Sequence, residues 1–405
     1  MNVAIPARHP DRPGAVPVMV WSLAQLLGIG KPTPAQWQSL GERLTVGDEP
    51  MDRLVDWMSS TGMAQTRPLF DRALAEGIDS VPDAPEPLRE FFIQIETVPD
   101  WVDRDKLRCG ARALRRGGAD GMYVARDVSL LGGYQFSGFN KTLLRTGALE
   151  KGSNKRFAET MQWALDVISE GGLDPLGAGY RSTIRVRLIH AFVRRHVGAM
   201  PDWRSDEWGL PVNQTDMAAT LVGALIAPPA GAIGMGLVSS PAELDGIAHL
   251  TRYAGWLIGV QDEWLPRSFR DGIRILYHTL TALAAPDEST KQLAVPMADD
   301  PMAWHYRYLP ALRRRIARAQ HLSVTSGFLG PRAMQSLGLA YVPPWYPLLR
   351  IPVNVTRSVA ALALPGGMSR ADTRGQREQE ALLRTMIGGA EATVGESAAH
   401  VVRVA

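Results

Sequence analysis

Apolar residues at helical spacing constrain the fold of this chain more than any other feature of its sequence. From Val18 onward they recur at steps of three and four residues in one segment after another, and glycine or proline separates most of these segments. The alternation of apolar and polar residues that is typical of strands, with β-branched side chains on one face, is almost absent. The sequence therefore predicts an all-α fold.

The length of 405 residues allows either one large helical domain or two domains. No internal repeat and no long linker divides the chain, which favours a single domain. We predict a disordered or draped N-terminal segment over residues 1–17, one helical domain over 18–365, and a polar C-terminal extension with one helix over 366–405.

Composition narrows the classes of function. Hydrophobic residues make up 45% of the chain and charged residues 21%, which permits a sizeable core and excludes wholesale disorder. The formal net charge is +3, but the basic residues are scattered among acidic ones, so nucleic acid is not an expected partner. A single cysteine, Cys109, excludes disulfide frameworks, cysteine-rich zinc sites and the two-cysteine motif that attaches haem covalently.

The N-terminus has no compact apolar stretch after a basic segment, so we expect a cytoplasmic protein unless a leader is missing from the sequence. The longest uncharged run, residues 217–237, is interrupted by Pro228-Pro229 and by several glycines. We therefore predict two buried helices that meet at this break, and no transmembrane span.

One histidine lies in a setting that suits an iron ligand. In the helical segment 180–197, His190 does not lie on the most apolar stripe but on a face shared with Val186, Val193 and Arg194. An imidazole among β-branched side chains suits an axial ligand of haem iron, with the valines against the porphyrin and Arg194 or Arg187 paired with a propionate. The alternative is an ordinary core histidine with a hydrogen-bonded ring.

A second helix can oppose His190. Arg156 and Thr160 lie on one line of the segment 153–170, with Glu159 beside them. The linker to the His190 helix is short, which favours an antiparallel pair whose faces oppose each other. A solvated helix face explains Arg156 and Thr160 equally well. Three other histidines on apolar helices remain alternative ligands: His249, His278 and His305.

Motifs of several other enzyme classes are missing. The chain has no paired Glu-x-x-His motifs of a di-iron bundle, no His-Glu-x-x-His zinc motif and no Gly-x-Ser-x-Gly nucleophile elbow. The glycine-rich stretch near residue 231 follows no predicted strand, so a dinucleotide-binding loop is not expected there.

Three short stretches together carry a family resemblance: RFAET at 156–160, RVRLIHAFVRR at 185–195 and GLPVNQTD at 209–216. With them the chain resembles the rubber oxygenase family, the latex-clearing proteins and related haem-dependent oxygenases, over about residues 20–365. The resemblance implies a globin-like helical core with additional helices. It also implies that His190 is the proximal ligand of a non-covalently bound haem b. Arg156 and Thr160 would then belong to the distal pocket, and Arg194 would support the site.

The reaction implied by the resemblance is cleavage of carbon–carbon double bonds in poly(cis-1,4-isoprene) by dioxygen, which leaves aldehyde and ketone ends. The partners are then a hydrophobic isoprenoid and dioxygen, and residues 217–237 are expected to line the uncharged channel. The resemblance also implies secretion if a leader is missing from the sequence, and a cytoplasmic location otherwise. The oligomeric state is not predicted.

This sequence departs from the family pattern at two distal positions. Glu159 stands where relatives can place a lysine before the distal threonine. Constant spacing puts Asn140 where relatives use a glutamate, with Lys141 or Glu150 as substitutes. Two alternatives therefore remain: a non-catalytic haem-binding or lipid-carrying protein, and a haem-free scaffold in which His190 is a core residue.

Overall fold

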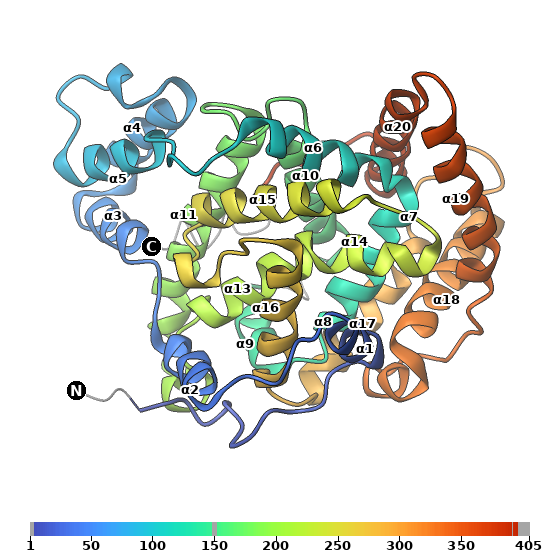
Figure 1. The fold of residues 1–405 in the computed structure, drawn as a ribbon. Helices are drawn as coiled ribbons and strands as arrows, with labels where there is room; N and C mark the ends of the chain where they lie inside the picture. Colours follow the sequence, from blue (N-terminus) through green and yellow to red (C-terminus); the bar gives the residue numbers. More distant parts are fainter. Residues whose placement is uncertain (1–3, 148–151, 391, 396–405) are drawn as a thin grey trace.

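The computed structural model describes residues 4–147, 152–390 and 392–395, and this part of the chain contains helices and no strand (Figure 1). The all-α prediction is confirmed, whereas the globin-like arrangement stays a prediction. The α-helices are α1 Val18–Leu26, α2 Pro34–Glu42, α3 Glu49–Thr61, α4 Met63–Glu76, α5 Glu86–Glu96, α6 Arg104–Arg116, α7 Gly118–Tyr123, α8 Leu131–Gly133, α9 Ser137–Arg145, α10 Ser153–Ile168, α11 Ala178–Gly198, α12 Ser205–Trp208, α13 Gln214–Leu225, α14 Ala227–Ala232, α15 Pro241–Leu257, α16 Phe269–Ala282, α17 Glu288–Asp299, α18 Pro310–Ser336, α19 Trp345–Ala363 and α20 Gly367–Ile387.

Short single-turn helices join several of these elements: η1 Arg43–Thr45, η2 Ile78–Ser80, η4 Ile233–Met235, η5 Asp262–Trp264 and η6 Asp300–Met302. The segment η3, Val124–Leu130, is a π-helix inside the glycine-rich stretch that follows α6. A π-helix is rare and often marks a functional site. Here it forms part of a cavity wall, as described below.

The Pro-Pro break predicted within residues 217–237 is present. Helix α13 ends at Leu225, and α14 carries Pro228 and Pro229 in its first turn, where a missing amide hydrogen costs nothing. By length and apolar composition, one segment in the described part of the chain, Gln214–Met235, could cross a bilayer, and half of its most apolar window is buried inside the protein.

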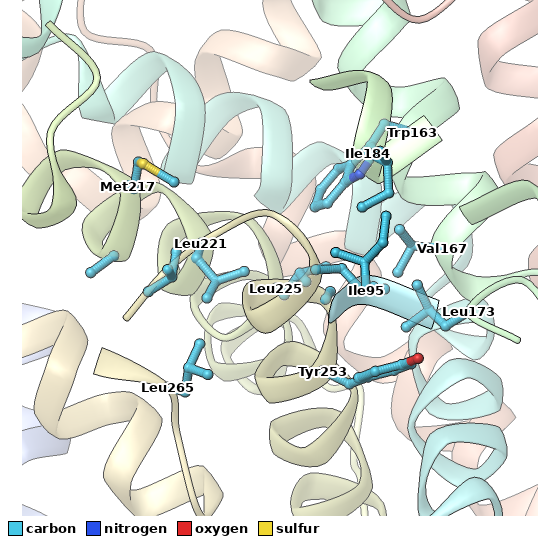
Figure 2. Packing of buried hydrophobic residues seen from close by; sticks show 14 of the residues in the cluster. Ile95, Trp163, Val167, Leu173, Ile184, Met217, Leu221, Leu225, Tyr253 and Leu265 are labelled. Atoms are coloured by element: carbon cyan, nitrogen blue, oxygen red, sulfur yellow. The ribbon is translucent and has the colours of Figure 1, made fainter. Parts of the chain in front are cut away.

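Two hydrophobic cores support the site. The main core lies among α3, α5, α11, α13, α15 and α16, and Figure 2 shows part of it around Trp163 and Ile184. The second core joins α10, α17, α18 and α20 around Trp304 and Met386. Helix α10 contributes to both, because Trp163 packs into the main core and Phe157 into the second.

Helices α6 and α15 cross closely enough to require glycine on both sides. A Cβ atom added to Gly110 would lie 2.3 Å from the carbonyl oxygen of Gly246. Any side chain at this crossing would force the two backbones apart.

Helices α10 and α11 form the predicted antiparallel pair. Trp163 Nε1 of α10 donates a 3.0 Å hydrogen bond to Thr183 Oγ1 of α11, and four residues away in each helix Gly179 lies against the backbone of Val167. Continuing this register by two turns places Arg156 at the level of His190, because both helices rise equally per residue.

Both ends of the domain are packed onto it. The segment before α1 is draped over the surface, where the amides of Ala7 and Arg8 donate to the carbonyls of Asp206 and Glu207. Helix α20 is no peripheral extension, because Leu382 and Met386 are buried in the second core.

Candidate functional site

His190 lies in the middle of α11, on the face between Arg187 and Arg194. The residue is half-buried, and its Nδ1 atom is buried without a hydrogen-bond partner among the described residues. Burial lowers the pKa of His190 to about 4, the charge of Arg194 adds to this effect, and Asp48 opposes it. The imidazole is therefore neutral at physiological pH, the state in which a ring nitrogen can bind iron.

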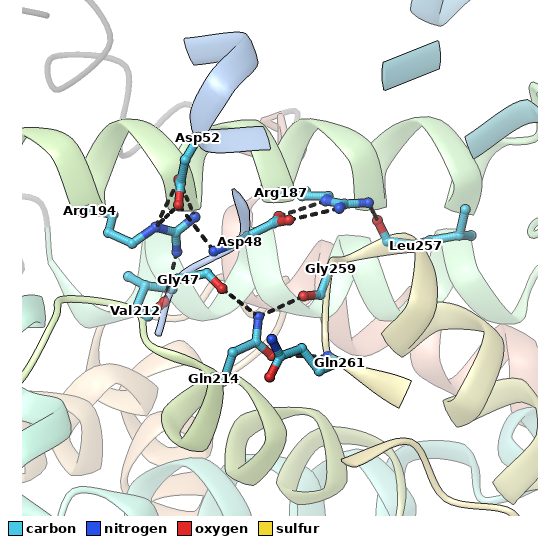
Figure 3. Close-up of polar contacts among 10 residues, drawn as sticks. All are labelled: Gly47, Asp48, Asp52, Arg187, Arg194, Val212, Gln214, Leu257, Gly259 and Gln261. Carbon is cyan, nitrogen blue, oxygen red and sulfur yellow. Dashed lines mark hydrogen bonds and ion pairs between the residues drawn. The ribbon is translucent and has the colours of Figure 1, made fainter. Parts of the chain in front are cut away.

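Arg187 ties the His190 face of α11 to the start of α3 (Figure 3). Its Nε and Nη2 atoms donate to both carboxylate oxygens of Asp48 at 2.7 and 2.8 Å, and Nη1 donates to the carbonyl of Leu257. Both charged side chains are almost fully buried. A bidentate buried pair of this kind fixes orientation strongly.

Arg194 forms the matching contact one turn beyond His190. It donates to Asp52 at 2.7 Å and to the carbonyl of Val212, just before α13 (Figure 3). Burial raises the pKa of Asp52, and the charge of Arg194 counters that rise. Both guanidinium groups are thus already bound to carboxylates, and the predicted pairing of Arg187 or Arg194 with a propionate stays a prediction.

A cavity of about 220 Å³ lies against α10 and α13. Its walls come from α1, η3, α10, α13, α14, α16 and α18, and most of its lining is apolar. The predicted channel segment contributes a row of small residues to this lining: Ala219, Thr220, Gly223, Ala224, Ala227 and Ala230. The expectation that residues 217–237 line an apolar space is confirmed.

Thr160 is the one predicted distal residue that lines this cavity. Its Oγ1 donates to the carbonyl of Arg156 at 3.0 Å, and the residue is solvent-accessible. Arg156 does not line the cavity. Its charge lies near Tyr134: burial raises the pKa of the Tyr134 hydroxyl, and the positive charge of Arg156 partly lowers it again. His190 does not line the cavity either, and about one helical turn along the α10–α11 pair separates its level from that of Thr160.

The two valines expected beside the porphyrin belong to the main core. Val193 is buried in it, and Val186 packs against it from a half-buried position. Neither residue lines the cavity.

Glu159 is buried and turned away from the cavity, where it accepts a 3.1 Å hydrogen bond from the amide of Gly395. This contact holds the chain after α20 against α10. Glu159 therefore does not reach the cavity wall.

Asn140 and Lys141 do not line the cavity, and their expected role as distal groups stays a prediction. Asn140 is fully buried and donates to the carbonyl of Tyr134 and to Ser289 Oγ. Lys141 forms an ion pair with Asp287 at the start of α17. Both side chains therefore hold α9 to its neighbours. Glu150, the third substitute, lies outside the described residues.

Asp216 is a carboxylate that the sequence did not single out. It is the only ionisable side chain among the described residues that line the cavity. Its Oδ2 atom accepts from Arg8 at 2.7 Å and from Asn213 at 2.9 Å, whereas Oδ1 is buried and has no hydrogen-bond partner among the described residues. The only signal in the sequence was its position at the end of GLPVNQTD.

Two of the three alternative histidine ligands are hydrogen-bonded to other groups, and the third is exposed to solvent. The Nε2 atom of His249 accepts from the amide of Asp103 at 2.8 Å, and Nε2 of His278 lies 3.0 Å from the carbonyl of Gly30. His305 is exposed. The first two fit the description of a core histidine with a satisfied ring nitrogen.

A buried charged cluster beside the second core was also missed. Nδ1 of His321 lies 2.5 Å from Asp127 in the π-helix, and Asp127 accepts from Arg126 at 2.6 Å. Arg126 also pairs with Asp300, whose pKa burial raises to about 6. These partners come from distant parts of the chain, so no local pattern could reveal them.

Comparison with known proteins agrees with this architecture. Residues 115–363 match the family model described as "ER-bound oxygenase mpaB/B'/Rubber oxygenase, catalytic domain". A rubber oxygenase of Streptomyces sp. (strain K30) is 24% identical over 206 residues, which is 49% of this chain and 48% of the relative, so the match spans about half the length of that protein.

A solved structure of a latex-clearing protein in its closed state superimposes with a TM-score of 0.62 at 18% identity, covering 87% of this chain and 92% of that one. This likeness shows a shared fold. Because the family model covers more than half of the chain, the protein belongs to the mpaB and rubber oxygenase family, which includes the latex-clearing proteins.

Proposed function

We propose that this protein is a haem b-dependent oxygenase. It cleaves carbon–carbon double bonds of poly(cis-1,4-isoprene) or a related unsaturated isoprenoid with dioxygen and leaves aldehyde and ketone ends. The observation that carries the proposal is the neutral imidazole of His190, whose buried Nδ1 atom has no hydrogen-bond partner among the described residues. It lies on the helix antiparallel to the one whose Thr160 lines an apolar cavity.

The His190 imidazole is the kind of group that would hold a porphyrin iron. A ligand nitrogen must belong to a neutral ring and be free of a competing hydrogen bond; the pKa of about 4 keeps the His190 ring neutral, and its Nδ1 atom has no hydrogen-bond partner among the described residues. The ion pairs of Arg187 and Arg194 fix the helix face from which the ring projects. When bound, haem supplies the activation of dioxygen, which no side chain in this chain can provide.

The apolar lining of the cavity is the reason for proposing an isoprenoid as the substrate. Small and apolar side chains of α13, α14 and α16 line a space that lacks charge except at Asp216. Transfer of a hydrocarbon chain from water into such a space lowers its free energy. Thr160 of α10 and Thr220 of α13 add hydroxyl-bearing side chains to this lining.

Asp216 is our candidate for the base that the family pattern places near Asn140. Its Oδ1 atom can accept an allylic proton, while Arg8 and Asn213 hold Oδ2 in place. The carboxylate comes from the N-terminal turn of α13, which is capped by Asn213 Oδ1. We therefore assign the proton transfer to Asp216 and give no role in it to Asn140 or Lys141.

A visible absorption spectrum of the purified protein, oxidised and then reduced, tests the haem. We expect a Soret band in the unaltered protein and its loss in His190→Ala. His196→Ala is the matched control, because His196 is a half-buried histidine on the same helix. A protein without a Soret band after haem reconstitution, or a His190→Ala variant that keeps its haem, contradicts the proposal.

A second candidate is a non-catalytic haem-binding or lipid-carrying protein. The position of Glu159, bound to Gly395 and away from the cavity, favours it, because the family's lysine position then contributes no group at the cavity. Oxygen uptake in the presence of polyisoprene or a squalene-like substrate separates the two. Uptake supports the oxygenase, and haem binding without uptake supports the carrier.

A further inference from the structure

Helix α19 turns an apolar face outward. Leu348, Leu349, Val359 and Leu362 are 63%, 62%, 59% and 72% exposed. Pro352, Val355 and Ala363 are exposed on the same side, and no charged residue lies among them. Scattered apolar residues are normal on a protein surface, but a continuous apolar face along a helix of 19 residues marks an interaction site.

Several polar residues of α19 point inward instead, whereas Thr356 is exposed on the apolar side with its hydroxyl donating to the carbonyl of Pro352. Arg350 Nε and Asn354 Nδ2 both donate at 2.8 Å to the buried carboxylate of Asp120, which also accepts from the hydroxyl of Tyr346. Arg357 pairs with Glu378 of α20. The usual arrangement of a surface helix is therefore largely reversed, since both arginines and Asn354 anchor α19 and most of its exposed side chains are apolar.

The apolar face continues onto the segment that follows α14. Asn354 donates to the carbonyl of Met235, and Gly236 lies against Ile351 and Val355. On either side of this contact, Ile233 is 50% and Val238 65% exposed. We call α19's outward residues together with Ile233 and Val238 the α19 face.

A row of arginines lies on α20, the helix that packs beside α19. Arg370, Arg374, Arg377 and Arg384 follow each other at helical spacing on the exposed side of α20. Arg374 shares Glu378 with Arg357, so this side of α20 adjoins α19. Within the described residues, Arg370 and Arg377 have no acidic partner within ion-pair distance.

We propose that the α19 face docks the protein onto the surface of an anionic phospholipid bilayer. Exposed leucine and valine enter the boundary of the acyl chains, and the neighbouring arginines meet the negative headgroups. A second copy of this chain is a less suitable partner, because each copy would bring its own row of arginines to the contact.

The α19 face lies close to a wall of the apolar cavity. Phe328 lines the cavity, and its ring lies next to Gly231 and Gly234, in the same segment that carries Ile233. The bilayer would therefore lie beside a wall of the apolar cavity, from which a lipid-soluble substrate can enter without crossing water. The docking itself does not depend on haem or on the proposed reaction.

Flotation with vesicles of phosphatidylcholine, with and without phosphatidylserine, tests this proposal on the full chain. We expect the unaltered protein to float with the anionic vesicles. The double variant Leu349→Glu/Leu362→Glu should lose at least about tenfold in partitioning, because two charges replace inserted leucines. Ile93→Glu on α5 is the matched control and should float normally, since Ile93 is 50% exposed elsewhere.

A second variant tests the arginines. Arg370→Glu/Arg377→Glu should remove the preference for phosphatidylserine and should leave the thermal unfolding temperature unchanged, because both side chains are exposed. Failure of the unaltered protein to float, or flotation of Leu349→Glu/Leu362→Glu at the normal level, overturns the proposal. A dimer in sedimentation analysis that this double variant dissolves assigns the face to a second copy and likewise overturns it.

Discussion

At the scale of single residues, the protonation of His190 offers a direct measurement. Burial places its pKa at about 4, below the ordinary value of 6.5. A proton competes with iron for the imidazole, so haem affinity falls as the pH drops below the pKa of the free protein.

We therefore predict nearly constant haem affinity between neutral pH and about pH 5.5, whereas a histidine with the ordinary pKa would lose about tenfold over this range. Haem titration of the apoprotein, followed at the Soret band, measures this. Circular dichroism at both pH values checks that the fold persists. A tenfold weakening would show that the ring is solvated like an ordinary surface histidine.

Asp216 permits a second prediction at this scale. Asp216→Asn keeps the shape of the side chain but removes the proton acceptor, so kcat for isoprenoid cleavage should fall by about 10²- to 10⁴-fold while haem content stays normal. Asp206→Asn is the control and should retain full activity, because Asp206 lies in α12, before the turn that leads into α13. Unchanged turnover in Asp216→Asn would remove this residue from the mechanism.

At the scale of elements, buried and exposed ion pairs join the same two helices, α3 and α11. Arg187 and Asp48 are 5% and 3% exposed at their side chains, whereas Arg195 and Asp56 are 47% and 66% exposed. Removing one partner of a buried pair leaves an uncompensated charge, whereas exposed pairs contribute little.

We predict that Asp48→Ala lowers the free energy of unfolding by about 3–5 kcal/mol. Asp56→Ala, on the same two helices, should cost less than about 1 kcal/mol. Urea denaturation followed by circular dichroism gives both values. Equal costs for the two variants would mean that the buried pair does not fix α11, and with it His190, against α3.

The antiparallel α10–α11 pair shows what local patterns could predict at this scale. Helical spacing and a short linker were enough to predict that the two helices oppose each other, as the hydrogen bond between Trp163 and Thr183 confirms. They could not predict that Arg194 meets Asp52, which precedes it by 142 residues. Sequence reasoning left the arginines free for a cofactor because their partners are distant in the chain.

At the scale of the whole molecule, the cavity depends on elements from both ends of the domain. Pro17 and Leu23 close it from the N-terminal side, and Phe328 and Leu329 from α18. The N-terminal segment also delivers Arg8 to Asp216, close to Gly138, where a larger residue would collide with the arginine. Residues 4–17 are thus part of the site and not an appendage.

The sequence by itself determined the all-α class, the pairing of α10 with α11, the Pro-Pro break and the apolar lining from residues 217–237, because each depends on spacing within a few turns of helix. It also placed His190 on a distinct face of its helix. Only the tertiary structure decided that Asp216 is the ionisable group at the cavity and that Asn140 and Lys141 serve α9. The apolar side of α19 turns outward because its polar residues bind Asp120 and Glu378. These positions depend on pairing between charged residues that are far apart in the sequence. Local sequence patterns do not show which distant partner a charged residue will contact.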